Sequence, residues 1–555
     1  MRSTFMGLEA SKRGLFTQQT ALYTTGHNIA NANTEGYSRQ RIIMSPTLGY
    51  PGAGLNAPMT PGHIGTGVKA ESVQRVRDEF IDRQYRQETN KLGYWETKAN
   101  AISQMEDVMS EPSEYGLDEA FRLFWSALQD VSANPDDTAA RKVVVQRAIH
   151  LADSFNYIDT QLKQIQGNLG NEINVSVEQI NSILEQIANI NKEIQAVEPN
   201  GYVPNDLYDK RDLLVDQLSG YLPVSIERVP SGGNASKVAE GSYTIKLNVK
   251  DNSGSYSEIV LVDGGNYATL RALDTSGKLV DGDEDTDPAN PQLAYLPFHQ
   301  LEISMGNKTQ TIGQENFQEF KGKLLSLIDS FGYSTDGTNN TIQGYFPEML
   351  QSLDKLANAF VQAFNKVHEA GYTLGKSDDP DTSVNGISFF DPAGLTAGTI
   401  KVNDALVKDP NLVAASSVQG EEGNGKWALI LANLQSMPIN NKESIGKIKD
   451  KDGNETTVEL PDNLGLDGAT FQSYYQGLIG QLGVDGQKAN LLKTNTETIR
   501  LTVENNRASM SSVSLDEEMT DMIRFQQAYS ANARMITVID ELLDKVINGM
   551  GRAGL

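Results

Sequence analysis

Apolar residues recur at every seventh position in the C-terminal part of the chain. This row consists of Leu515, Met522, Tyr529, Ile536, Leu543 and Met550. A weaker second row, four positions behind the first, consists of Met519, Ala533 and Ile547. The repeat predicts a helix of about 35 residues with one apolar stripe. A helix cannot bury a single stripe by itself, so this segment requires a partner helix.

The N-terminal segment carries a similar seven-residue repeat, formed by Leu8, Leu15, Leu22 and Ile29. Its companion positions are polar or small, so this helix is weak in isolation. Two interpretations fit the stripes at the two ends of the chain. Either both helices pack on an ordinary globular core, or the ends pair with each other and with neighbouring subunits. In the second case the two rows form an assembly interface.

A longer helical pattern runs from about residue 136 to 197. Asn134-Pro135-Asp136 is typical of a helix start, and Glu198-Pro199-Asn200-Gly201 is typical of a stop. Between Leu169 and Ile173 the repeat gains four residues, and two glycines lie beside this step. The segment is therefore either one long rod or two helices. Shorter helices are expected at about 78–110, 117–132 and 206–219.

The period changes to two between about residues 222 and 313, which predicts antiparallel β structure. Helices return at 323–329 and 346–368, and residues 371–470 are mixed, with short strands expected at 387–390 and 400–402. A further helix begins near Phe471 and continues towards the C-terminus. The expected fold class is multidomain α plus β: a long, coiled-coil-like helical core from both termini and adjacent helices, with inserted β-rich outer domains.

This order of elements suggests four structural units. The expected units are a terminal helical domain (1–60 with 505–555), a long-helix domain (61–220 with 320–370 and 471–504), a β-rich outer domain (221–319) and a mixed insertion (371–470).

Composition narrows the chemistry that the 555 residues can support. A formal net charge of −25 argues against nucleic-acid binding, because phosphate backbones are repelled. The absence of cysteine excludes disulfides, cysteine-ligated metals and thiol catalysis, and the five histidines lack metal-ligand spacing. No cofactor is expected. No apolar run is long enough to span a bilayer, and the N-terminus does not resemble a cleaved leader. The protein is therefore expected in the cytosol, or outside the cell by export without a cleaved signal peptide.

Four sequence motifs suggest catalysis or metal binding, and each is incomplete. Residues 420–426 fit a phosphate loop, but Trp427 replaces the Ser or Thr that holds magnesium. Residues 281–287 resemble a calcium loop without its Gly and terminal Glu, so weak calcium binding stays open against a solvated acidic turn. Ser352-x-x-Lys355 lacks its companion motifs, and His368-Glu369 lacks the second His of a zinc helix. No catalytic or metal site is therefore predicted.

The segment from Asn28 to Gln40, Asn-Ile-Ala-Asn-Ala-Asn-Thr-Glu-Gly-Tyr-Ser-Arg-Gln, follows the first predicted helix directly. It resembles the N-terminal signature of bacterial flagellar axial proteins, which include rod, hook and hook-associated families. The continuation through Arg41 and the segment from Gln526 to Ile536 are most similar to the hook-associated family of the hook–filament junction. Physically, such a segment is a helix stop followed by a defined turn. The signature residues are Asn28, Asn31, Asn33, Thr34, Gly36 and Tyr37.

The resemblance implies a structural protein without catalysis, exported through the flagellar type III apparatus and located in the extracellular flagellum. Its ends would be disordered in the free subunit and fold on assembly into a ring of identical subunits. Its implied partners are the hook protein, a second junction protein and an export chaperone. The chaperone would cover the C-terminal stripe at Met519, Met522, Ile536 and Leu543. Alternatives are another axial protein, of the hook or distal rod, or a hydrolase carried on a flagellar scaffold.

Overall fold

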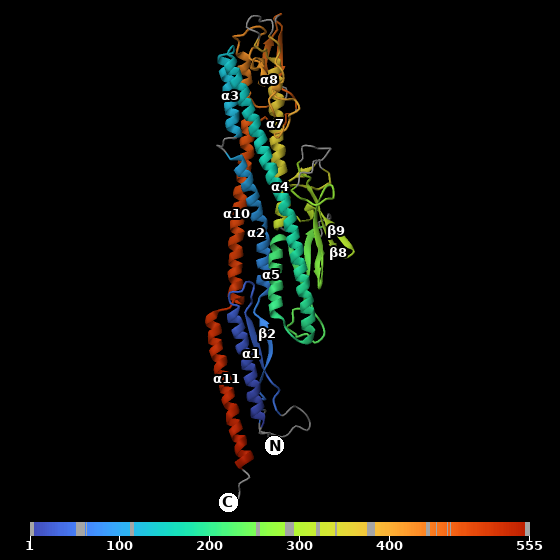
Figure 1. Ribbon diagram of the computed structural model, residues 1–555, viewed down its shortest axis with the longest axis vertical. Coiled ribbons are helices and arrows are strands. Elements are labelled where there is room, and N and C mark those ends of the chain that lie inside the picture. The colour runs from blue at the N-terminus through green and yellow to red at the C-terminus, as the bar shows by residue number, and fades with distance from the viewer. Residues whose placement is uncertain are drawn as a thin grey trace.

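The protein is an elongated rod with both chain ends at one extremity (Figure 1). The computed structural model describes residues 5–50, 62, 64–110, 116–250, 256–282, 294–317, 322–338, 341–374, 383–439, 444–450, 452–462, 464–466 and 468–549. Long helices follow the axis of the rod, and β-sheets lie against one side of it (Figure 1). The predicted fold class, helical at both ends with antiparallel sheets inserted, is confirmed.

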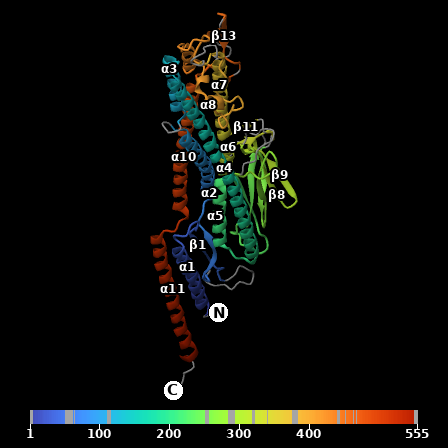
Figure 2. The same cartoon turned by 45° about the horizontal axis from the view of Figure 1, so that its top comes forward.

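The terminal region contains two helices and one hairpin. Its elements are α1 (Met6–Ala30), β1 (Gln40–Pro46), β2 (Val68–Arg75) and α11 (Leu515–Asp544), and a π-helical turn (Lys545–Gly549) extends α11. The strands pair antiparallel from Gln40↔Arg75 to Pro46↔Val68. Both strands and α11 contact α1, and the two helices lie side by side in both views (Figures 1 and 2).

The body of the rod is a bundle of helices. These are α2 (Glu79–Met109), α3 (Leu117–Ala133), α4 (Thr138–Val197), α5 (Asn205–Tyr221), α6 (Lys323–Phe331), α7 (Tyr345–Ala370) and α10 (Phe471–Ser511). The segment from 138 to 197 is one unbroken helix, which settles the choice between one rod and two helices. Gly167 and Gly170 lie within this helix and leave no room for a Cβ, because Tyr295 packs on the first and the Asp281 carbonyl and Phe331 pack on the second.

Helix α4 has a defined start and end. The Asp137 side chain accepts a hydrogen bond from the Ala139 amide at 2.8 Å, which caps the first turn. A 3-10 turn (Glu198–Asn200) ends the helix, and Gly201 follows with a φ of 85°. That left-handed backbone suits glycine, which has no Cβ to clash. The predicted stop signal at 198–201 is confirmed.

Two sheets pack beside α4. The first has the order β3 (Val224–Val229), β4 (Ser242–Lys250), β5 (Tyr256–Asp263), β6 (Asn266–Tyr267). The second has the order β11 (Ile342–Gln343), β10 (Tyr333–Ser334), β8 (Phe298–Met305), β7 (Thr269–Asp274), with β9 (Lys308–Ile312) also paired to β8. Pairing is antiparallel except where β10 meets β8. A 3-10 turn (Gln314–Phe317) follows β9.

The apolar residues that alternate along β4 confirm the predicted period of two. Ile245, Leu247 and Val249 are buried, whereas the intervening Lys246 and Asn248 are partly exposed. The buried face of β4 contacts α4, so this sheet is covered on the side towards the rod.

The end of the rod opposite the termini holds the mixed region. Its regular elements are α8 (Asp404–Lys408), a 3-10 turn (Pro410–Leu412), α9 (Lys426–Asn433), β12 (Ser444–Lys449) and β13 (Glu455–Glu459). The strands predicted at 387–390 and 400–402 are wrong, because only a single bridge joins Phe390 to Val402. Both segments instead bury apolar side chains in irregular backbone, the first bonded to Asn365 of α7 and the second to Asn156 of α4.

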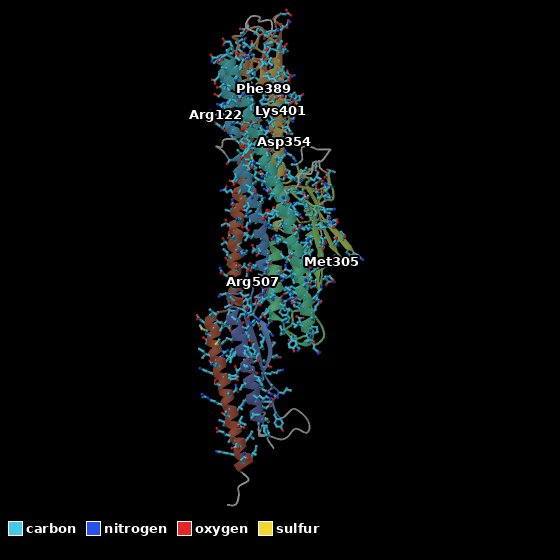
Figure 3. The ribbon with its side chains drawn as sticks, in the orientation of Figure 1. Arg122, Met305, Asp354, Phe389, Lys401 and Arg507 are labelled. Atoms are coloured by element: carbon cyan, nitrogen blue, oxygen red, sulfur yellow. The ribbon has the colours of Figure 1, made fainter. Side chains whose placement is uncertain are left out.

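An aromatic cluster joins α3, α7 and α10 at this end of the rod. Its rings lie 5.0–6.5 Å apart in edge-to-face, tilted or stacked arrangements, and all are buried. Phe389, labelled in Figure 3, belongs to it. The cluster anchors helices that are far apart in sequence. Its members are Phe121, Phe124, Trp125, Phe155, Phe360, Phe364, Phe389, Phe390 and Phe471.

The helix predicted to continue from Phe471 to the C-terminus is interrupted. Helix α10 ends at Ser511, and α11 begins at Leu515. Ser512 and Ser514 adopt extended backbone angles, which break the hydrogen-bond ladder between the helices. The apolar pattern continues across this break, so periodicity alone could not reveal it.

The incomplete motifs have ordinary structural surroundings. Residues 420–425 form a turn before α9, and the Ser352 hydroxyl donates to the Glu348 carbonyl within α7. Within the described residues there is no cluster of three or more His, Asp or Glu side chains placed to hold a metal. The segment 281–287, for which the sequence leaves weak calcium binding open against a solvated acidic turn, lies mostly outside the described residues, from 283 onward. Among the helices described, none is long and apolar enough to cross a membrane.

His368, on α7, is completely buried and hydrogen-bonded through both ring nitrogens. Its Nδ1 lies 2.6 Å from the Ile387 carbonyl oxygen, and its Nε2 lies 2.9 Å from the Ala414 amide nitrogen. This pairing requires a neutral ring that donates from Nδ1 and accepts at Nε2. Burial lowers the pKa of His368 from 6.5 to about 4. The imidazole therefore locks two irregular segments to α7.

Acid should weaken the end of the rod that contains His368. Its pKa is lower in the folded than in the unfolded chain, so its contribution is present above pH 6.5 and falls as pH drops towards 4, by roughly 3 kcal/mol. We expect His368→Gln to unfold more easily at pH 7 and to lose this pH dependence. Urea unfolding of both proteins between pH 4 and 7.5 measures the difference. Parallel pH profiles would contradict the assignment.

Candidate assembly site at the joined termini

Helices α1 and α11 pair in an antiparallel arrangement with a fixed register. A Cβ on Gly7 would lie 3.3 Å from Ile539, and one on Gly14 would lie 2.7 Å from the Asn532 side-chain oxygen. At the other end of the pair, Asn28 donates to Glu518 at 3.0 Å. Each step of seven or fourteen residues along α1 is thus matched by an equal reverse step along α11. The two helices therefore interlock with the coiled-coil period.

The facing row on α1 consists of small or polar residues. Gly7, Gly14, Ala21 and Asn28 are seven residues apart, and the last three are buried. Small side chains let the backbones approach closely, at the places where Ile539 and Asn532 come nearest. Sequence reasoning missed this row because it sought large apolar residues.

The predicted interface rows are only partly covered by the helix pair. Leu8, Leu15, Leu22 and Ile29 on α1 are half-buried, as are Met522, Tyr529, Ile536 and Leu543 on α11. Leu515 differs, because its side chain is 48% exposed at the start of the helix. Met550 lies outside the described residues.

Of the predicted second row on α11, Ala533 is half-buried, but the other two members are wrong. Met519 and Ile547 are 50% and 70% exposed, so they do not face α1. The row that faces α1 lies three positions behind the first, rather than four, and consists of Glu518, Phe525, Asn532 and Ile539. Two of its members are polar, and their polar atoms have partners: Glu518 accepts from Asn28, and Asn532 donates to the Ala528 carbonyl of its own helix beside Gly14.

Asn28 connects the end of α1 to two other elements. Its side-chain nitrogen donates to the Gln40 carbonyl at 2.8 Å and to Glu518 at 3.0 Å. Its side-chain oxygen accepts from the Tyr37 hydroxyl and the Gln40 amide, both at 2.9 Å. All four hydrogen-bonding positions of the amide are thus used, and the side chain is 1% exposed. Asn28 therefore fixes α1, β1 and α11 in one geometry.

The other signature residues shape the turn after α1. Asn31 caps the helix by donating to the His27 carbonyl at 3.0 Å, and Thr34 donates to the Asn31 side-chain oxygen at 3.2 Å. Gly36 has a φ of 77° and packs against Leu213 of α5. Burial, then nearby carboxylates, raise the pKa of Tyr37, which keeps its hydroxyl protonated as a donor to Asn28. Asn33 is exposed at the tip of the turn.

Arg39, just after the turn, joins the N-terminal segment to the break between α10 and α11. Its amide donates to the Ser511 carbonyl at 2.8 Å. Its guanidinium contacts Glu517 at 2.6 Å and Glu518 at 2.7 Å, near the start of α11. These carboxylates also stabilise the positive N-terminal end of that helix. The sequence contains both parts of this contact, a basic residue beside the signature and an acidic first turn in α11. It does not show that the two parts meet.

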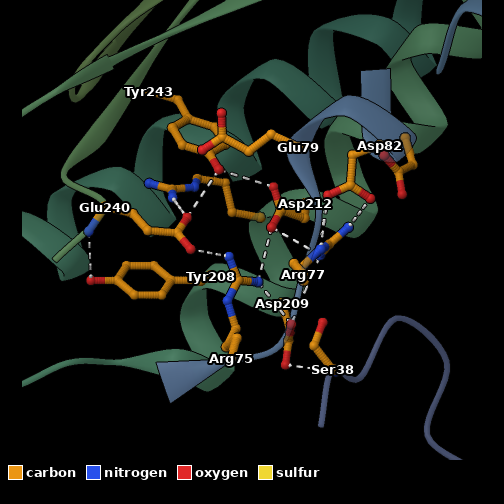
Figure 4. A network of polar contacts seen from close by, with 12 residues as sticks. Ser38, Arg75, Arg77, Glu79, Asp82, Tyr208, Asp209, Asp212, Glu240 and Tyr243 are labelled. Atoms are coloured by element: carbon orange, nitrogen blue, oxygen red, sulfur yellow. Dashed lines mark hydrogen bonds and ion pairs between the residues drawn. The ribbon is translucent and has the colours of Figure 1, made fainter. Parts of the chain in front are cut away.

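A buried network of arginines and carboxylates lies directly beyond the terminal region (Figure 4). Asp209, Asp212 and Asp216 occupy one face of α5. Their partners come from β2, the connection between β2 and α2, α2 and α10, at distances between 2.6 and 3.3 Å. These partners are Arg75, Arg77, Arg86 and Arg507. The network therefore joins the hairpin of the terminal region to three helices of the rod.

Asp212 is the centre of the network. It lies 2.9 Å from both Arg75 and Arg77, and it accepts from the Tyr243 hydroxyl at 3.1 Å. Burial would raise its pKa, but Arg77, Arg75 and Arg86 together outweigh burial and hold the pKa well below its usual range. Asp212 is therefore charged at any physiological pH. An isolated helix would leave this acidic face in water, so the sequence alone did not indicate the network.

Large apolar side chains on α11 stay exposed after it pairs with α1. They form two patches with helical spacing, one at each half of the helix, and each side chain is 47–58% exposed. The proximal patch is Leu515, Met519 and Ile523, and the terminal patch is Met535, Val538, Leu542 and Val546. Helix α1 adds Phe5, Phe16 and Tyr23, which are also more than half exposed. Contiguous exposed apolar residues of this kind mark interaction surfaces.

Comparisons with known proteins agree with these features. The family model "Flagellar hook-associated protein FlgK helical domain" matches residues 102–383. Two flagellar rod models match the ends: "Flagella basal body rod protein" at 8–37 and "Flagellar basal body rod FlgEFG protein C-terminal" at 505–549. The end models cover the two segments that pair as α1 and α11.

Full-length relatives are also similar. Flagellar hook-associated protein 1 of Bacillus subtilis is 42% identical, with 100% of both chains covered. That of Salmonella typhimurium is 26% identical over 96% of this chain and 98% of its own. A solved structure, the flagellar hook junction protein FlgK from Burkholderia pseudomallei, shares the fold with a TM-score of 0.50 at 13% identity, covering 78% of this chain and 100% of its own.

The helix pair, its turn and these matches define a structural protein of the bacterial flagellar axis. Within that class, the chain belongs to the flagellar hook-associated protein 1 family, the structural proteins of the hook–filament junction. The predicted family is confirmed, and a hook or rod subunit is the poorer alternative because the relatives match over the full length.

Asn28→Asp should unpair the terminal helices. The substitution places a second carboxylate at hydrogen-bonding distance from Glu518 and removes two donated hydrogen bonds. We expect the helix pair to lose about 3 kcal/mol. Hydrogen exchange of α1 and α11 amides measures this loss. The matched control is Asn33→Asp, which makes the same change at an exposed position. Equal exchange in the two variants would refute the role of Asn28.

Asp212→Asn should destabilise the whole rod. Loss of one buried charge leaves Arg75 and Arg77 with less compensation, which costs about 3–5 kcal/mol. Urea unfolding of the full chain measures the change. Asp153→Asn, at an exposed position on α4, is the control because it alters net charge equally. If both variants unfold at the same urea concentration, the network does not contribute as described.

Proposed function

We propose that this protein is the adaptor between hook and filament, and that it assembles as a ring of identical subunits through the terminal helix pair. The exposed patches on α11 and the exposed aromatic residues of α1 support this role, because they remain available after the two helices pair. Contacts between different faces of neighbouring copies would form the ring. The hook protein and a second junction protein would occupy its two sides.

Folding of the ends would be completed during assembly. Of the side chains described in α11, which is 30 residues long, only Glu518 is buried. Helix α1 buries mainly small or polar residues, so the pair removes little apolar surface from water. Isolated helices with so little burial are only marginally stable. Neighbouring subunits would supply the missing burial, as in other segments that fold on binding.

An export chaperone would bind α11 before assembly. Of the four residues expected to contact it, Met519 is exposed, whereas Met522, Ile536 and Leu543 are half-buried in the helix pair. A chaperone that covers all four must therefore separate α11 from α1. Chaperone binding and helix pairing would then exclude each other, which keeps the subunit unpaired until it leaves the cell without a cleaved signal peptide.

The remaining parts would have structural roles. The four predicted units would be the terminal domain, the long-helix domain, the β-rich outer domain and the mixed insertion, with the β domain on the outside of the assembled structure. The two sheets that pack beside α4 lie on one side of the rod and away from the termini, which supports this placement (Figure 1). We assign no catalytic activity to the protein, because its family is structural.

Ile523→Asp with Leu542→Asp should abolish assembly and leave the monomer intact. Both side chains are more than half exposed, at 56% and 58%, so charge there costs the isolated subunit little. In the ring, the same charges would be buried without partners. Motility and filament attachment in cells with this variant as their only copy measure assembly, and thermal melting measures folding.

The control for this experiment is Thr520→Asp with Thr537→Asp, which adds the same charge at exposed polar positions of α11. We expect these cells to swim normally. Normal motility of the Ile523 and Leu542 variant, or a large fall in its melting temperature, would contradict the proposed interface.

A further inference from the structure

Helix α10 contains four glycines at three-residue intervals: Gly477, Gly480, Gly483 and Gly486. Glycine is the poorest helix former apart from proline, so this segment is the weakest part of a 41-residue helix. Gly486 has a packing reason, because a Cβ there would lie 2.5 Å from the Glu106 carboxylate and 3.2 Å from Ile102. The other three have none, since nothing lies within 4 Å of the position of a Cβ.

The glycine segment lies beside a break in the neighbouring helices. Above it, Gln472 and Gln476 of α10 each donate to Asp118, near the start of α3, at 3.2 Å. Below it, Gly486 packs on α2 at Ile102 and Glu106. Helix α2 ends at Met109 and α3 begins at Leu117, so α10 passes from one helix to the other over its glycines (Figure 1).

Each end of the segment is anchored by completely buried residues, whereas its middle is held only by Leu482 and the half-buried Ile479. Phe471 and Tyr475 are fully buried above it, and Ala489 is fully buried below it. Between Tyr475 and Gly486 the only buried side chain among those described is Leu482. A helix with little burial and low intrinsic stability opens locally before the rest of the structure does.

Two other helices run through this level without interruption. Helix α7 contacts Lys98 of α2 below, where the ammonium lies 4.4 Å from the Tyr345 ring centre. Above, its Phe360 ring lies 5.4 Å from Phe471. Helix α4 likewise contacts both α2 and α3. The rod therefore has two continuous helices on one side of this level and a weakened or interrupted pair on the other.

We propose that residues 477–486 of α10, which lie where its contacts change from α2 to α3, form a bending joint in the rod. Helices α4 and α7 act as the continuous spine, and the glycine segment lengthens or shortens as the part of the rod that contains α3, α8 and α9 tilts. Such a joint lets one chain adopt slightly different shapes at different positions of an assembly. It is independent of the terminal helix pair.

The absence of cysteine makes the joint directly measurable. Ser126→Cys on α3 and Ser509→Cys on α10 introduce two exposed label sites on opposite sides of the joint. Spin labels at both sites report the distribution of distances by double electron–electron resonance. We compare this pair in the otherwise unchanged full chain with the same pair carrying Gly477→Ala, Gly480→Ala and Gly483→Ala.

The alanine triple variant should narrow the distance distribution. It should also slow hydrogen exchange of the 477–486 amides about 10- to 100-fold, because each exposed Gly→Ala change favours the helix about 2- to 5-fold. No steric clash is expected at these three positions, so the variant should fold.

The matched control carries Asn490→Ala, Asn495→Ala and Asn505→Ala, which raise helix propensity at exposed positions of α10 outside the joint. It should leave the distribution unchanged. An equally narrow distribution in the control would overturn the joint, and so would an unchanged distribution in the glycine variant. If the glycine variant has an unchanged distance distribution but no longer assembles, the glycines instead provide space for contact with a neighbouring subunit.

Discussion

The meeting of the two chain ends is the constraint on which the rest of the structure depends. Asn28 and Glu518 are 490 residues apart in sequence and 3.0 Å apart in space. Both are almost completely buried, and a buried amide or carboxylate is costly unless it is hydrogen-bonded. The chain must therefore leave this contact after Asn28 and return to it before Glu518. The rod, the sheets and the mixed region are all formed by the residues in between.

Next to the point where Asn28 and Glu518 meet, a group of buried arginines pairs with the carboxylates of this acidic chain. The net charge is −25, yet arginines from β2, α2 and α10 converge on three aspartates of α5, and Figure 4 shows the part around Arg75, Arg77 and Asp212. Fully paired charges of this kind fix geometry more than they add stability. Arg75, on β2, thereby sets how the terminal region sits on the rod, whereas Arg507, labelled in Figure 3, joins α10 to α2 and α5. The weakly buried helix pair thus projects from a firmly held base.

Much of the fold was predictable because its helices and sheets have strong periods. The seven-residue rows located α1 and α11, the stop at Glu198–Gly201 ended α4, and alternation located β4. The predictions from sequence were wrong where tertiary contacts outweigh the local backbone preference. The segment near Phe390 is irregular because side chains of α7 complete its backbone hydrogen bonds, and Asn156 of α4 does so at Ile400 in the segment near Val402. The true second row of α11 contains Glu518 and Asn532, which look solvent-facing until their partners are known.

The sequence by itself determined the class of elements, the helical ends with unsatisfied stripes and, through the segment from Asn28 to Gln40, the family. These depend on local backbone preference and on side-chain periodicity, which any short window of sequence contains. Only the tertiary structure decided the register of α1 on α11, the role of Arg39 and the arginine–aspartate network. Each of these joins residues distant in sequence, and the free energy of a buried polar group depends on the partner it meets rather than on its neighbours along the chain.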